Sequence, residues 1–171
     1  RYMIAISRLG LVRMALLFGL SLAASAPWAQ EVDPPGRVGR LGEMQGRVWF
    51  YDIEQGQWVE GQRNRVLTSG DRISTERGGR AQISVGSTEL RLDEDTELEF
   101  SRIDDERMVF QLHNGSVALQ VRSREMAREI ELQSGLVRVL PEREGHYRID
   151  DEDEFSTVAA WRGTVNVDAG N

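Results

Sequence analysis

Apolar and polar residues alternate with a period of two over most of the chain beyond residue 38. In "RMVFQLHNGSVALQV", residues 107 to 121, this alternation runs up to an Asn-Gly pair and resumes after it. Asn-Gly is favoured in two-residue turns in which both central residues need positive φ. We therefore predict a hairpin with Asn114 and Gly115 as its loop, Leu112 opposite Val117, and one wholly apolar face.

Three more short turns give the same result when the flanking residues are paired across them. They are centred on Gly86-Ser87, Ser134-Gly135 and Arg162-Gly163. The apolar pairs expected across them are Ile83 with Leu90, Ala81 with Leu92, Leu132 with Val137, Ile130 with Val139, Ala160 with Val165, and Val158 with Val167. Helical spacing of apolar residues is poor, and only "SREMAREI", residues 123 to 130, suits a helical turn. The pattern therefore predicts an all-β fold of hairpins and tight corners.

The first 29 residues have the layout of a secretory signal peptide. Three arginines precede the apolar run 14–24, and the small-residue stretch "SAPWAQ" follows. The apolar run is shorter than the roughly 20 residues that a membrane span needs. We predict cleavage after Ala26 or Ala29, with Ala29 favoured, and no stable membrane span once residues 1–29 are removed. The alternative is an uncleaved N-terminal anchor.

The remaining 142 of the 171 residues suit a single domain. Adjacent prolines in "EVDPPGR" hold the chain extended, so we assign residues 30–37 to a Pro-rich linker and 38–168 to the β domain. The formal charge of −7 becomes −10 without the signal, because three arginines leave and 18 basic residues face 28 acidic ones. Nucleic acid and anionic membrane are poor partners for such an acidic protein.

Residues for catalysis or metal binding do not assemble into a recognisable set. The acidic clusters at 93–97, 104–106 and 150–154 lack the glycine and glutamate positions of a calcium loop, so we interpret them as solvated turns. Calcium at 150–154 is the strongest alternative. His113 and His146 have no second histidine or cysteine nearby in sequence. The chain contains no Lys and no Cys, which excludes Schiff-base and P-loop chemistry and disulfides. We expect no enzymatic activity, cofactor or metal.

The aromatic residues Trp49, Tyr51 and Trp58 form the most distinctive candidate site. They lie in a region where both faces of the expected strands are apolar or aromatic. On the sequence alone we favour core filling beneath the sheet. The alternative is an exposed platform that stacks on sugars or contacts a partner protein.

Several segments carry a family likeness, among them "DPPGRVGRLGEMQGRVWF", "SGDRI" at 69 to 73, "NGSVALQVR" and "WRGTVNV". Over about residues 34 to 168 the chain resembles the FecR domain of exported proteins of Gram-negative bacteria. The resemblance implies an all-β module of short stacked strands with a solenoid-like or sandwich core. The best-known members are iron-uptake regulators, in which the periplasmic domain senses an outer-membrane receptor and a cytoplasmic segment controls a sigma factor.

The expected function follows from this resemblance. A signal-like N-terminus stands where those regulators have a cytoplasmic helical segment and a spanning helix, so we do not carry over anti-sigma activity. We expect a periplasmic or secreted module of the cell envelope that is not an enzyme and acts in protein interaction or signalling with an envelope protein. The alternative is a glycan-binding envelope protein that uses Trp49, Tyr51 and Trp58. A hydrolase acting through the acidic turns is a third possibility.

Overall fold

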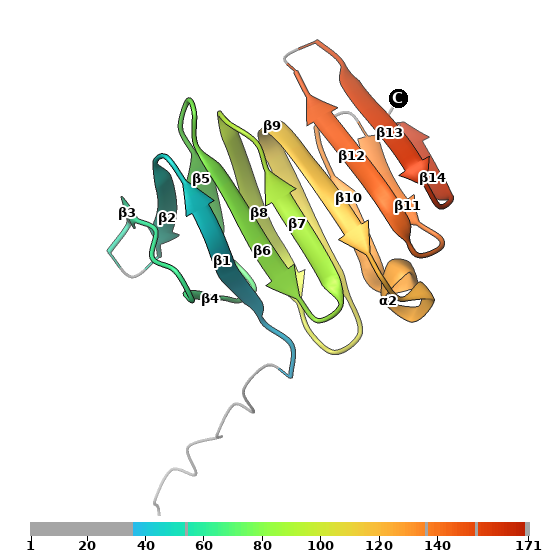
Figure 1. The fold of residues 1–171 in the computed structure, drawn as a ribbon, viewed down its shortest axis with the longest axis horizontal. Helices are drawn as coiled ribbons and strands as arrows, with labels where there is room; N and C mark the ends of the chain where they lie inside the picture. The colour runs from blue at the N-terminus through green and yellow to red at the C-terminus, as the bar shows by residue number, and fades with distance from the viewer. Residues whose placement is uncertain (1–35, 54, 136, 153, 170–171) are drawn as a thin grey trace, which may run out of the picture. The chain divides into compact units, whose positions relative to one another are not determined.

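The computed structural model describes residues 36–53, 55–135, 137–152 and 154–169, so the expected signal peptide lies outside the described residues. Two β layers face one another, and most of the strands advance along them in chain order (Figure 1). Sheet A contains β1 (Gly39–Gln45), β4 (Val66–Leu67), β6 (Arg80–Val85), β7 (Thr88–Leu92), the second half of β9 (Met108–Val121), β12 (Gly145–Asp151) and β13 (Ser156–Arg162). The all-β prediction is confirmed.

Sheet B forms the other layer and is joined to sheet A through the long strand β9. It contains β2 (Val48–Asp52), β3 (Gln57–Glu60), β5 (Arg72–Thr75), β8 (Thr96–Ile103), the first half of β9, β10 (Ile130–Gln133), β11 (Val137–Pro141) and β14 (Val165–Ala169). The described strand pairs are antiparallel except β9 with β10, which is parallel. Among the strands that the structure describes, β13 pairs only with β12 and β14 only with β11.

The inward-facing side chains of both sheets form one hydrophobic core. Phe100 of β8 and Phe110 of β9 meet there edge to face, with their ring centroids 5.4 Å apart. Tyr147 of β12 is also buried, and its hydroxyl donates to the backbone carbonyls of Arg143 at 2.8 Å and Thr164 at 3.1 Å. Burial raises the pKa of the Tyr147 hydroxyl above its ordinary value.

Two of the four predicted hairpins form. The Gly86-Ser87 turn joins β6 to β7 with the expected partners, including Ile83 opposite Leu90. The turn at Ser134-Gly135 joins β10 to β11, but Leu132 pairs with Val139 and not with Val137. Because this shift is two residues, each side chain stays on its expected face.

The hairpin predicted at Asn114-Gly115 is wrong. At Arg162-Gly163 the expected strand pairs do not form, and the chain makes the tight corner that the pattern also allowed. β9 continues through Gly115 and passes from sheet B into sheet A, and the chain crosses from β13 in sheet A to β14 in sheet B at Gly163. Gly115 has φ of 88° and Gly163 φ of 99°, whereas Asn114 is not among the residues with positive φ. One positive φ suits a corner in a strand, and a two-residue turn of the expected type needs two.

Side-chain hydroxyls link the corner at Gly115 to two neighbouring crossings between the sheets. Thr75, at the end of β5, donates from Oγ1 to the carbonyl of Asp93 at 2.6 Å and accepts from the backbone N–H of Thr96 at 3.0 Å. Thr96 Oγ1 in turn accepts from the backbone N–H of Ser116 at 2.9 Å. Three consecutive crossings between the sheets are therefore linked by buried hydrogen bonds.

The helical turn expected at 123–130 is confirmed as α2 (Arg124–Glu129), which carries the chain from β9 to β10. Ser123 caps it by accepting from the backbone N–H of Met126 at 3.4 Å. Arg37 pairs with Glu129 at 2.8 Å, so the last residue of the expected linker contacts the domain. In the part of the chain that is described, no helix has the length and hydrophobicity of a membrane span.

Candidate functional site

The aromatic residues singled out in the sequence lie on the outer face of sheet B. In β2, Val48 and Phe50 are buried in the core, whereas Trp49 and Tyr51 alternate with them and are half-buried. Because successive side chains of a strand point to opposite faces, Trp49 and Tyr51 face away from the core. The predicted core role for this trio is therefore wrong.

Strand pairing brings the third aromatic to the same place. Trp58 of β3 lies directly opposite Tyr51, with the two ring centroids 5.4 Å apart and the ring planes inclined at 64°. Trp58 is 38% exposed. The aromatic platform, defined here as Trp49, Tyr51 and Trp58, is thus assembled by the β2–β3 hairpin.

The orientation of Trp49 is set by a carboxylate. Its indole Nε1 donates to Glu76 Oε1 at 2.7 Å, and Glu76 Oε2 accepts from Arg47 at 3.3 Å. An indole held at its N–H cannot turn freely, so its ring is ordered before any ligand arrives.

Polar residues continue the platform across the sheet in two rows. One row runs from Trp58 and Tyr51 to Arg72 of β5 and Glu99 of β8, and the other from Trp49 to Ser74 and Glu97. Neighbouring strands lie about 4.8 Å apart, so four strands span roughly 14 Å. Trp49, Trp58, Ser74 and Glu97 enclose a shallow hollow of about 440 Å³. Hollows of this size fall within the range of small-molecule sites.

The charged residues of the rows are paired with one another. Arg72 Nε lies 3.0 Å from Glu99, Arg72 Nη1 lies 3.9 Å from Glu97, and His113 Nε2 lies 2.9 Å from Glu99. Partial burial raises the pKa of Glu99, but the hydrogen bond from His113 and the charge of Arg72 outweigh it and hold the pKa below its ordinary value. Glu99 is therefore ionised at neutral pH and accepts hydrogen bonds.

This arrangement suits binding better than acid catalysis. A glycosidase acid must keep its proton near neutral pH, which requires a raised pKa, and Glu99 is shifted in the opposite direction. Flat aromatic rings beside carboxylates and a hydroxyl instead offer stacking surface and hydrogen-bond partners to a ligand rich in hydroxyl groups.

The other candidates from the sequence lie apart from the platform. Asp150 forms an ion pair with Arg148 at 2.7 Å, so one carboxylate of the acidic run 150–154 has a basic partner. Within the described ranges, histidine and acidic side chains do not gather into a group of three that would hold a metal. His146 lies on β12 of sheet A.

Sequence reasoning missed the polar half of the site. Ser74 and Glu97 alternate with buried residues in "RIST" and "TELEF", so their outward direction is readable from the pattern. Their position beside Trp49 depends on the register of β2 with β5 and of β5 with β8. No turn residue in the sequence sets that register, because long connections separate these strands.

The strands from β5 to β14 carry the similarity to known proteins. The family model described as FecR protein matches residues 71–166, more than half of the chain. The chain belongs to the FecR family. The same comparisons found no match among curated proteins or among solved structures. The FecR family is a regulatory and signalling family associated with the cell envelope of Gram-negative bacteria, and it is not known for enzymes.

The residues matched by the FecR model do not include the first four strands of the domain. The match begins at Asp71, just before β5, whereas the sequence suggested a likeness from about residue 34. Trp49, Tyr51 and Trp58 all precede the match. The aromatic platform is therefore built on strands outside the matched residues, and only its polar neighbours on β5 and β8 fall within them.

Proposed function

We propose that this FecR-family chain is a periplasmic module of the cell envelope that is not an enzyme and that acts in signalling by binding an envelope protein. The observation that carries the proposal is the family match over residues 71–166, which covers most strands of both sheets. The signal-like layout of residues 1–29 supports export.

The free edge of β13 offers a means of contact. Within the described ranges this strand is hydrogen bonded to a neighbouring strand on one side only, and its sequence, STVAAWR, carries no charge before Arg162. Natural proteins usually protect exposed edges with charges, prolines or bulges in the middle of the strand. An edge without charges is suited to accept a strand from a partner through its unpaired backbone groups.

Site-specific crosslinking in the periplasm tests this proposal. A photo-crosslinkable residue replaces Thr157, which is exposed on the β13 edge, and in a matched control it replaces Gln57, which is exposed on the β3 edge outside the family match. We expect the chain in the periplasmic fraction, and a defined envelope protein captured at Thr157 but not at Gln57. A cytosolic chain, or identical products at both positions, would contradict the proposal.

A second candidate function is glycan binding at the aromatic platform, favoured by the exposed position of Trp58 above the hollow shared with Trp49. We expect fragments of envelope glycans to shift the tryptophan fluorescence. The Trp49→Ala, Trp58→Ala double variant should lose binding at least tenfold while its thermal melt stays close to that of the parent chain.

Trp161→Ala serves as the control for that test, because Trp161 is exposed on β13 away from the platform. Its binding should equal that of the parent chain. Equal glycan affinity of the platform variant and the Trp161 variant would rule out the platform as a glycan site.

A further inference from the structure

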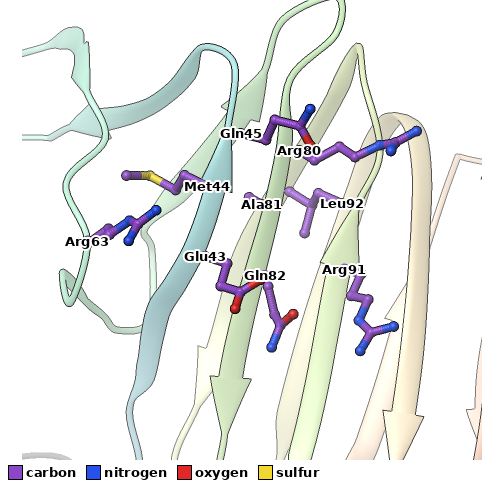
Figure 2. Close-up of a pocket in the computed structure, with 9 residues that line it drawn as sticks. All are labelled: Glu43, Met44, Gln45, Arg63, Arg80, Ala81, Gln82, Arg91 and Leu92. Atoms are coloured by element: carbon purple, nitrogen blue, oxygen red, sulfur yellow. The ribbon is translucent and has the colours of Figure 1, made fainter.

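A second hollow lies on the outer face of sheet A. The pairing of β1 with β6 shifts register between Leu41 and Met44, so β1 bulges beside its neighbour. The hollow, of about 510 Å³, lies over β1, β6 and β7 (Figure 2). Its polar lining consists of three arginines, one carboxylate and two amides, namely Arg63, Arg80, Arg91, Glu43, Gln45 and Gln82.

The arginines of this hollow have more N–H donors than their ion pairs use. Arg80 pairs with Asp93 at 3.0 Å and Arg91 with Glu89 at 2.6 Å, and each guanidinium carries five N–H donors, more than one carboxylate uses. Arg63 is exposed and makes no ion pair with any residue in the described ranges. Figure 2 shows Arg63 on one side of β1, and Arg80 and Arg91 on the other.

The strands of sheet A carry an excess of arginines at their outward positions, although the chain as a whole is acidic, with a formal charge of −7. Outward positions on the strands of sheet A carry five arginines against three carboxylates: Arg40, Arg80, Arg91, Arg148 and Arg162 against Glu43, Glu89 and Asp150. Outward positions of sheet B show the reverse: Glu60, Glu97, Glu99, Glu131 and Asp168 against Arg72, Arg102 and Arg138. The fold thus sorts charge by face.

We propose that the hollow at β1, β6 and β7 binds an acidic peptide segment of the partner protein. This inference rests on the proposed function, that the chain binds an envelope protein. Arginine forks match the geometry of carboxylates, and they stand on both sides of the hollow. The glutamine amides offer donors and acceptors to a peptide backbone. The volume of the hollow, about 510 Å³, also falls in the range of pockets that hold ligands much larger than one inorganic anion.

The test measures binding of fluorescent hexaglutamate to the purified chain at low ionic strength, with hexaglutamine as the uncharged probe. We expect hexaglutamate alone to bind, and raised salt to weaken it. The Arg63→Gln, Arg80→Gln variant should bind about tenfold more weakly, since two charge-assisted contacts are lost. Both changes spare the fold, because Arg63 is unpaired in the described ranges and Asp93 keeps Arg148 at 3.3 Å.

The matched control is Arg107→Gln, Arg124→Gln, which removes two exposed arginines from other parts of the surface. Its affinity should stay close to that of the parent chain. Equal weakening by both double variants, or no hexaglutamate binding at low salt, would overturn the proposal. Displacement by inorganic phosphate as effective as that by unlabelled hexaglutamate would also overturn it in favour of a small-anion site.

The hollow and the β13 edge lie at opposite ends of sheet A, so their tests fail separately. Loss of hexaglutamate binding with intact crosslinking at Thr157 would reject the hollow alone. Loss of crosslinking with intact hexaglutamate binding would reject the proposed mode of partner contact and leave the hollow as an acidic-peptide site.

Discussion

Replacing Gly115 with valine is expected to destabilise the domain by about 3 kcal/mol or more. Gly115 has φ of 88°, a conformation that costs a β-branched residue about 1 to 3 kcal/mol. A Cβ atom there would also lie 2.4 Å from Thr96 Oγ1 and 2.5 Å from the Asp95 carbonyl, so the corner would have to shift. Forced shifts in a packed region add about 1 to 3 kcal/mol. Chemical denaturation measures the loss.

Substitutions at two other glycines separate the cost of backbone strain from the cost of steric overlap. A Cβ atom at Gly78 would meet nothing within 4 Å but φ is 74°, so Gly78→Val should show the backbone strain alone. Gly135 is also open and is not among the glycines with positive φ, so Gly135→Val should be nearly neutral. Equal unfolding midpoints for the Gly115 and Gly135 variants would contradict the corner that joins the two sheets in β9.

Thr75→Val should cost about 2 kcal/mol or more, although the two side chains have nearly the same shape. Thr75 is 2% exposed, and its hydroxyl donates to the Asp93 carbonyl and accepts from the Thr96 N–H. Valine leaves both backbone groups without this partner, and each buried unsatisfied group costs about 1 to 3 kcal/mol. Equilibrium denaturation with urea gives the difference in the free energy of unfolding.

Thr88→Val is the matched change, with the opposite expectation. Thr88 is 1% exposed in β7, and its hydroxyl has no hydrogen-bond partner within the described ranges. Replacing an unpartnered buried hydroxyl with a methyl group removes a desolvation cost, so stability should stay equal or rise by up to about 1 kcal/mol. A loss at Thr88 as large as that at Thr75 would show that the hydrogen bonds of Thr75 are not the cause.

Each of the two candidate sites lies partly inside and partly outside the residues that the FecR model matches. The strands matched by the FecR model supply Ser74 and Glu97, while Trp49 and Trp58 come from the hairpin before the match. The hollow on sheet A is divided in a similar way, with Arg63 before the match and Arg80 and Arg91 within it. Both candidate sites therefore combine family strands with residues from the N-terminal part of this domain.

The sequence determined much of the architecture through local patterns. Alternation with a period of two specified all-β structure, and Gly86-Ser87 set the register of β6 with β7. Alternation also specified which residues face inward, including Leu112 and Val117 on either side of Gly115. At the Ser134-Gly135 hairpin, the faces were predictable although the register was not.

The destination of a strand after each turn was decided only by the tertiary structure. The inward residues of β9 change from even numbers before Gly115 to odd numbers after it. A two-residue hairpin produces that change, and so does one extra residue at a corner where the strand enters the facing sheet. The two alternatives bury the same side chains, so the pattern cannot distinguish them. Contacts with Thr96 and Asp95 on a neighbouring corner decide between them.

The same reasoning applies to the candidate sites. Trp49, Tyr51 and Trp58 were visible as residues, but β2 reads as apolar on both faces, so the sequence did not show which face was buried. One face of sheet B packs on the core and the other faces solvent. Trp49 therefore lies on the outer face, beside Ser74 and Glu97. The basic hollow depends even more on tertiary structure, because Arg63, Arg80 and Arg91 meet only through the pairing of β1, β6 and β7. Long-range strand pairing brings residues together that are distant in the sequence, and local patterns do not predict that pairing.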